Sequence, residues 1–170
     1  MLKPSVVKLI NEQINKEFFS AYLYLDMANY YNSKNLDGFA NWFNIQAQEE
    51  RDHAMLFIQY LGNNNAEVKL EAIAAPAIEF VDFRTPLVES LKHEQFVTAS
   101  IETIYEEAKN QKDYRTQEML NWFIKEQGEE EKNAEDNIGK YDLFAGDPKG
   151  LYALNAEMLA RVYTAPSLVL

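Results

Sequence analysis

The sequence predicts an all-α protein built as a four-helix bundle, with a long crossover between the second and third helices and a short fifth helix. Three observations support this fold class. Apolar residues recur at helical spacing along nearly the whole chain. Glycine (6) and proline (5) are scarce among the 170 residues, which favours long uninterrupted helices. Polar or proline-containing breaks divide the periodic stretches into segments of helical length.

The first two helices are expected from about Val6 to Tyr31 and from about Leu36 to Leu61. The apolar stripe that marks the first consists of Ile10, Ile14, Ala21, Leu25, Ala28 and Tyr31. A short polar break at residues 32–35 separates the two helices, and the run from Gly62 to Asn65 is a stop signal for the second. Because the link is short, the pair should be an antiparallel hairpin.

Residues 66–84 lack helical periodicity and contain Pro76. Thr85 and Pro86 look like an N-cap followed by proline at the first helical position, so the third helix is expected from about Pro86 to Gln111. Such a long link within a compact domain needs a reason. If it runs the length of the bundle, the second and third helices are parallel. A bundle with one long crossover has the ferritin-like topology.

The second hairpin closes with a polar turn around Lys112, and its second helix is expected from about Arg115 to Leu143. Residues 146–150 break the chain, and an amphipathic segment from about Leu151 to Tyr163 predicts the short fifth helix. We expect residues 1–145 to form the bundle and residues 146–170 to form the short helix and tail of the same domain.

Composition narrows the function. The formal net charge of −11 makes nucleic acid an unsuitable ligand and cations the natural partners. Cysteine is absent, which excludes disulfides and thiolate metal sites. No segment has the length and apolarity of a signal peptide or a membrane span, so a cytoplasmic protein without a membrane partner is expected.

Ionisable residues interrupt the apolar faces of all four long helices. Glu17 lies in the stripe of the first helix. Glu50 and His53 are three residues apart on the second helix and therefore point the same way. Glu94 lies on the core face of the third, and the fourth carries residues 126–130, Glu-Gln-Gly-Glu-Glu.

The two hairpins present these groups at matching depths. Glu17 and Glu50 are 33 residues apart, as are Glu94 and Gln127, and His53 and Glu130 are 77 apart. The alignment is not unique, because Asn-Trp-Phe at 41–43 recurs at 121–123 with a shift of 80.

Unpaired carboxylates in a bundle core are costly, and bound cations offset that cost. Carboxylates with one imidazole suit iron or manganese, with zinc as a competitor. Glutamates from two helices with Glu-x-x-His motifs on the others describe di-iron carboxylate bundles. Here one hairpin has Glu50-x-x-His53 and the other has Gln127-x-x-Glu130.

At these residues the sequence resembles the bacterial non-haem ferritins. The resemblance covers nearly the whole chain, from NEQINKEFFSAYLYLDMANY through WFIKEQGEEE to the short C-terminal helix. It implies an iron-storage ferritin with ferroxidase activity, which oxidises Fe(II) with O2 or H2O2 at a di-iron centre within each subunit. It also implies a hollow homo-oligomeric shell of 24 subunits that stores the ferric oxyhydroxide mineral.

The resemblance implies roles for individual residues. It puts one iron on Glu17, Glu50 and His53, and a second iron on Glu50, Glu94 and Glu130, with Glu50 bridging the two.

Further residues match the family around this pair. Gln127 matches a glutamine on the oxidant side, and Tyr24 matches a tyrosine beside the centre. A third iron site is implied at Glu49, Glu126, Glu129 and Glu130. From the residues alone, the acidic run 129–131 is equally compatible with a solvated charged face.

Departures from related families are also informative. Bacterioferritins carry a second Glu-x-x-His motif and bind haem through a methionine beside the metal histidine. Asp52 stands in that position here, so no haem is expected. Rubrerythrins add a cysteine-rich iron domain that this chain lacks. His93 is expected at the surface.

Two other functions remain open at this point. One is a di-iron peroxidase or oxygenase that acts on an organic substrate, which needs an apolar pocket beside the metals. The other is a structural helical protein without metal chemistry.

Overall fold

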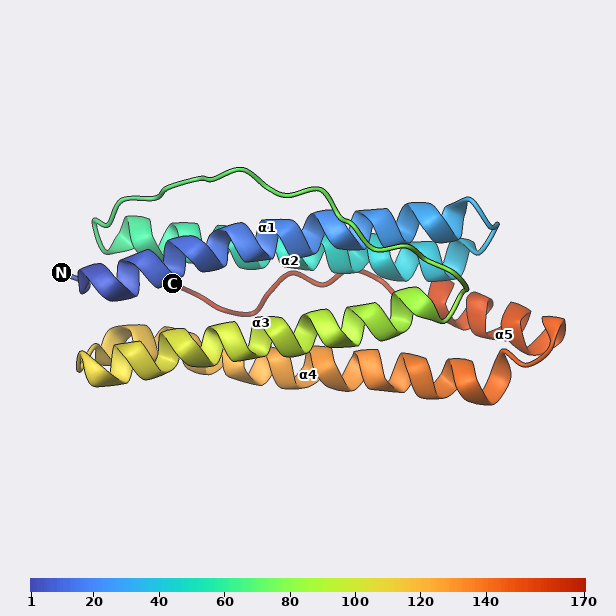
Figure 1. Cartoon of the computed structure of the whole chain (residues 1–170). Helices are drawn as coiled ribbons and strands as arrows, with labels where there is room; N and C mark the ends of the chain where they lie inside the picture. Colours follow the sequence, from blue (N-terminus) through green and yellow to red (C-terminus); the bar gives the residue numbers. More distant parts are fainter.

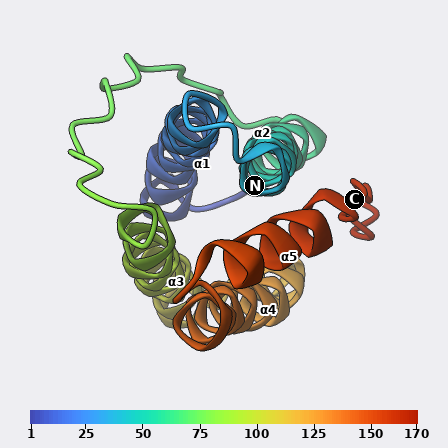
Figure 2. The ribbon, with the colours of Figure 1, turned by 90° about the vertical axis from the view of Figure 1, so that its right-hand side faces the viewer.

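The computed structural model covers all 170 residues and contains five helices and no strand. The helices are α1 (Pro4–Asn32), α2 (Asp37–Asn63), α3 (Thr85–Asn110), α4 (Tyr114–Phe144) and α5 (Pro148–Leu159). Two antiparallel hairpins, α1–α2 and α3–α4, lie side by side, as Figures 1 and 2 show. The predicted all-α, ferritin-like bundle with a short fifth helix is therefore confirmed. None of the five helices combines the length and apolar composition of a bilayer span.

Three of the four long helices, α1, α2 and α3, are followed by a turn residue in the left-handed backbone region. Asn35, Asn65 and Lys112 have φ angles of 58°, 54° and 55°. Asparagine tolerates this conformation better than most side chains, which explains its use at two of the three turns. The polar breaks seen in the sequence therefore stop the helices close to the expected positions.

The start of α3 differs from the expectation. Thr85 is the first helical residue rather than the cap, and Asp82 accepts hydrogen bonds from its backbone N–H and its hydroxyl, each at 2.7 Å. These hydrogen bonds lower the pKa of Asp82, chiefly the one from the Thr85 hydroxyl. The carboxylate that caps this helix thus lies three residues earlier than the sequence signal indicated.

The crossover between α2 and α3 runs along α1, and Figure 1 shows it spanning the bundle. Near its start, Asn11 donates to the carbonyl of Glu67 at 3.0 Å and accepts from the backbone N–H of Lys69 at 2.6 Å. Near its end, the Tyr31 hydroxyl donates to the carbonyl of Phe83 at 2.6 Å. The link therefore carries the chain back to the other end of the bundle, and α2 and α3 run parallel as predicted.

Two separate apolar clusters fill the bundle, one toward each end. The first includes Ile10, Phe57, Ile101 and Phe123, and the second includes residues of the other half of α1 and α2 together with α5. A polar layer lies between them. In α1 the expected apolar stripe is wrong at one position, because Leu25 is exposed.

Helix α5 lies across the end of the bundle against α2, as Figure 2 shows, and it requires a glycine there. A Cβ at Gly38 would lie 1.7 Å from the backbone oxygen of Asn155. The Asn155 side chain also accepts from the backbone N–H of Gly38 at 2.9 Å. The helix ends at Leu159, earlier than the predicted Tyr163, and the remaining tail runs back along the bundle (Figure 1).

Replacing Gly38 with alanine should lower the free energy of unfolding by about 1–3 kcal/mol, because α5 must move to admit the methyl group. Guanidinium unfolding followed by circular dichroism measures the change. Gly62→Ala is a matched control in the same helix, since nothing lies within 4 Å of its added methyl. Gly62→Ala should leave the free energy of unfolding unchanged or raise it by up to about 1 kcal/mol. Equal destabilisation by both substitutions would contradict the close packing of α5.

Candidate metal centre

The polar layer between the two apolar clusters gathers six predicted site residues from all four long helices. They are Glu17 of α1, Glu50 and His53 of α2, Glu94 of α3, and Gln127 and Glu130 of α4. All six side chains are buried. The helical spacing explains this, because each residue lies on the face of its helix that packs inward.

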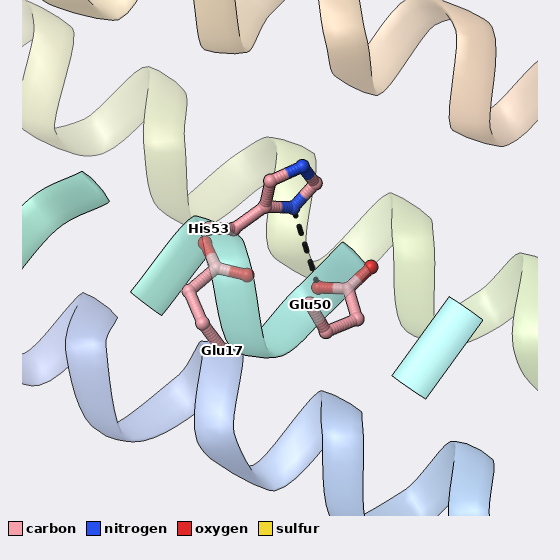
Figure 3. A group of neighbouring side chains, drawn as sticks. All are labelled: Glu17, Glu50 and His53. Carbon is pink, nitrogen blue, oxygen red and sulfur yellow. Dashed lines mark ion pairs between the residues drawn. The ribbon is translucent and has the colours of Figure 1, made fainter. Parts of the chain in front are cut away.

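Glu17, Glu50 and His53 form the tightest group, drawn in Figure 3. Each offers one ligand atom, and these atoms all lie within 4.8 Å of one another. Nδ1 of His53 lies 3.7 Å from Oε2 of Glu50. Both oxygens of Glu50, Oε2 of Glu17 and Nδ1 of His53 have no hydrogen-bond partner. Buried polar atoms rarely stay unpartnered, and three neighbouring residues with such atoms fit a bound cation.

Two glutamines each donate a hydrogen bond to one carboxylate of the layer. Gln13 donates to Oε1 of Glu17 at 2.8 Å, and Gln46 donates to Oε2 of Glu130 at 2.8 Å. The sequence interpretation missed both glutamines. The sequence contained a feature that could have indicated them. Gln13 precedes Glu17, and Gln46 precedes Glu50, by four residues, which is about one helical turn and places each glutamine on the same helix face as a site carboxylate.

Glu94 is held by two residues that the sequence singled out. The hydroxyl of Tyr24 donates to one of its oxygens, and Nε2 of Gln127 donates to the other at 3.1 Å. Tyr24 and Gln127 therefore meet at the same carboxylate. Their geometry orients Glu94 from two sides.

Burial and mutual repulsion disfavour charge on these carboxylates. Burial raises the pKa of Glu50 well above its ordinary value, and the neighbouring Glu94 and Glu17 raise it further. Burial raises the pKa of Glu94 to about 7, against the hydrogen bonds from Tyr24 and Gln127, and that of Glu130 to about 8. A divalent cation would favour the charged forms. Carboxylates with one imidazole are the donor set for iron or manganese, with zinc as a competitor.

The four residues predicted for a third iron differ in their surroundings. Glu126 places Oε1 4.0 Å from Nε2 of His53, on the ring edge away from Glu50. Glu49 is engaged by Arg161, whose Nη2 lies 2.6 Å from Oε2 of Glu49. Glu129 is exposed. The third site therefore stays a prediction, and one of its carboxylates already has a cationic partner.

His93 is half-buried rather than on the surface, contrary to the expectation. Its Nε2 lies 2.7 Å from the hydroxyl oxygen of Ser20, and burial lowers its pKa to about 4. The spacing of apolar residues on α3 did not indicate this, because the ring packs against Phe19 and Tyr24 of α1.

The metal-free protein should lose stability as the pH rises from about 5 to 8. The folded-state pKa values of Glu94 and Glu130, about 7 and about 8, lie above the unfolded value of about 4.3. The folded state therefore keeps protons that the unfolded state has released, and this contribution is lost as the pH rises through the folded values.

Urea unfolding in the presence of a chelator, repeated across this pH range, measures the slope of the free energy of unfolding against pH. Glu130→Gln should make the slope shallower, whereas Glu102→Gln, which removes an exposed carboxylate of α3, should leave it unchanged. A slope that is the same in wild type and Glu130→Gln would contradict the burial argument.

Comparison with known proteins agrees with this architecture. A family model described as a ferritin-like domain matches residues 7–144. A bacterial non-heme ferritin of Staphylococcus aureus is 36% identical over 163 residues, 96% of this chain and 98% of that protein. A bacterial non-heme ferritin of Staphylococcus epidermidis is 37% identical over 163 residues, with the same coverage of 96% and 98%.

Solved structures give the same result. An engineered closed form of the Archaeoglobus fulgidus ferritin matches with a TM-score of 0.94 and 37% identity, over 96% of this chain and 100% of that chain. The open-pore ferritin of Archaeoglobus fulgidus matches with a TM-score of 0.92 and 37% identity, over 95% of this chain and 98% of that chain. By its sequence over nearly its full length, its fold and its buried carboxylate layer, this chain belongs to the ferritin family.

Proposed function

We propose that this protein is an iron-storage ferritin that oxidises Fe(II) to Fe(III) at a centre of two iron positions within each subunit. One observation carries the proposal. In a buried layer to which four helices contribute, Glu17, Glu50 and His53 converge with four ligand atoms that have no hydrogen-bond partner. Family membership makes Fe(II) the natural cation for this donor set.

The first iron position uses Glu17, Glu50 and His53, and the second uses Glu50, Glu94 and Glu130. A bridging role for Glu50 is supported by its two free carboxylate oxygens. Each of the other three carboxylates has at least one oxygen held by a side-chain donor, which orients it without needing the metal.

The reaction follows from two adjacent Fe(II) ions that share an oxidant. Each loses one electron, and O2 with two protons becomes H2O2, or H2O2 with two protons becomes two water molecules. Anionic carboxylate ligands stabilise Fe(III) over Fe(II) and so favour the oxidation. Fe(III) then hydrolyses to ferric oxyhydroxide and releases protons.

The size of the adjoining cavity favours a small oxidant over an organic substrate. The cavity is bordered by Tyr24, Gln46, Glu94 and Glu130 and has a volume of about 10 Å³, which is room for about one water molecule. An oxygenase for organic substrates needs a larger apolar pocket beside the metals. A larger cavity of about 320 Å³ adjoins Gln127 on the other side, but only two of its nine lining residues, Ile101 and Ile124, are hydrophobic. The small cavity and the polar lining of the larger one support a ferroxidase over that rival.

Storage requires an assembly, and we propose a hollow shell of 24 identical subunits. Exposed apolar side chains support contact with other copies, among them Tyr22 and Leu25 of α1 and Leu70, Ile73 and Val81 of the crossover. The net charge of −11 supports attraction of Fe(II) to the particle. We expect no haem, because Asp52 stands in the haem-ligand position and accepts a hydrogen bond from Tyr163.

Glu50→Gln should slow the initial aerobic oxidation of Fe(II) by about tenfold or more, because it removes the proposed bridging ligand with little change of shape. His53→Ala should act in the same direction. Stopped-flow absorbance after Fe(II) addition measures the initial rate. Glu102→Gln removes a carboxylate from the exposed face of α3 and should leave the rate unchanged. An unchanged rate in Glu50→Gln would refute the assignment of the centre.

The purified protein should elute as one particle of about 470 kDa, since 24 copies of a 19.7 kDa chain have that mass. Size-exclusion chromatography with light scattering gives the mass, and iron in the same peak tests storage. A monomer without iron after Fe(II) loading would support the structural-protein alternative instead.

A further inference from the structure

The tail that follows α5 places a cation of the protein itself on the acidic face beside the centre. Nη2 of Arg161 lies 2.6 Å from Oε2 of Glu49, and each of these side chains is only 15% exposed. Nη1 of Arg161 donates to the backbone oxygen of Trp42 at 3.2 Å. The guanidinium carbon also lies 4.1 Å from the centroid of the Trp42 ring. Three contacts of different kinds therefore fix the guanidinium at Glu49.

Other contacts hold the tail on both sides of this ion pair. Asn41 donates to the carbonyl of Arg161 at 3.1 Å, and the Tyr163 hydroxyl donates to Asp52 at 2.5 Å. Farther along, Nε1 of Trp122 donates to the hydroxyl of Ser167 at 3.0 Å, which attaches the tail to α4. The tail is thus bound along α2 and reaches α4. This distinguishes Arg161–Glu49 from an isolated surface ion pair, which would contribute little.

Glu49 borders the buried centre. It is adjacent in sequence to Glu50 and lies about one helical turn before His53 on α2. On the facing helix, Glu126 lies 4.0 Å from Nε2 of His53, the ring nitrogen that points away from Glu50. A cation bound outside the centre, between α2 and α4, would need the carboxylate of Glu49. That carboxylate is already paired with the positively charged guanidinium of Arg161.

We propose that Arg161 acts as a tethered counter-cation that occupies Glu49 and so sets how many metal ions each chain binds. The two buried positions are open, whereas the third, at Glu49, Glu126, Glu129 and Glu130, opens only when Arg161 withdraws. The inference rests on the proposed function for the two buried positions. It gives the C-terminal tail a role in controlling the outer position.

Arg161 has physical advantages over a metal ion in the competition for Glu49. The guanidinium stays charged at any pH at which the protein is folded, so it cannot be removed by deprotonation. Because it is tethered to the same chain, it returns to Glu49 at a high effective concentration. An incoming ion must displace a charge-assisted hydrogen bond and the stacking on Trp42. The tail therefore weakens binding at the outer position without contacting the buried one.

Zn(II) titrated into the full-length assembled protein by calorimetry tests the inference without redox chemistry, since Zn(II) accepts both imidazole and carboxylate ligands. Wild type should show two tight positions and a weak third. In Arg161→Gln the third should tighten by about tenfold to a hundredfold, as expected when a charge-assisted contact no longer competes. The double variant Glu49→Gln with Arg161→Gln should lose that gain.

Arg84→Gln is the matched control. It also removes one positive charge from a guanidinium paired with a carboxylate, because Arg84 donates to Asp142 at 2.7 and 2.8 Å. It lies outside the tail and should leave all Zn(II) affinities unchanged. The inference would be overturned if the Zn(II) affinity of the third position in Arg161→Gln were within twofold of that in wild type. It would also be overturned if the gain in this affinity persisted in the double variant. Loss of the first two positions in wild type would instead count against the proposed function.

Fluorescence gives a second measurement. The chain has two tryptophans, so Trp122→Phe leaves Trp42 as the sole reporter beneath Arg161. Zn(II) beyond two equivalents should change the Trp42 emission as the guanidinium leaves the ring. The same addition to Trp122→Phe with Arg161→Gln should give no such change. Constant emission while the third position fills would mean that the ion binds without displacing Arg161, and the inference would be wrong.

Discussion

The burial of four carboxylates in one layer, where lost hydration and then mutual repulsion oppose their charge, is the constraint on which this structure depends. Glu17, Glu50, Glu94 and Glu130 lie in one layer between two apolar clusters, where water cannot screen them. Burial raises the pKa of three of them, Glu50, Glu94 and Glu130, because each charged form loses its hydration and meets other negative charge. Cations relieve both effects at once. Folding stability and metal binding are therefore linked through the same few side chains.

The bundle forms this layer by bringing one or two of the predicted site residues from each long helix to a common depth. The long crossover makes that possible, because it returns the chain to the far end of the bundle and sets α2 and α3 parallel. Its hydrogen bonds to Asn11 and Tyr31 hold it along α1. Side-chain donors then orient the outer carboxylates, while Glu50 keeps both oxygens free. Glu50 is therefore the one carboxylate of the layer that no side-chain donor orients.

The sequence by itself determined the helices, the crossover and the four carboxylates, the histidine and Gln127 of the buried layer, but not Gln13 and Gln46. Helical periodicity is a local property, so the four long segments and their breaks could be read directly. Glu50 and His53 share a face because they are three residues apart. The equal spacings within the two hairpins placed Glu17 opposite Glu94 in the same way. These conclusions needed only the geometry of a helix and the cost of burying charge.

Only the tertiary structure decided what each carboxylate contacts. Leu25 is exposed and His93 is half-buried because their surroundings depend on how α1 and α3 pack, which periodicity defines only loosely. The pairing of Arg161 with Glu49 joins residues 112 positions apart, and Arg161 lies in the tail after α5 although the sequence predicted it inside that helix. Contacts between distant segments depend on the folded path of the chain. For that reason the sequence identified the buried carboxylate layer, and the structure showed that the neighbouring Glu49 is already paired with a guanidinium.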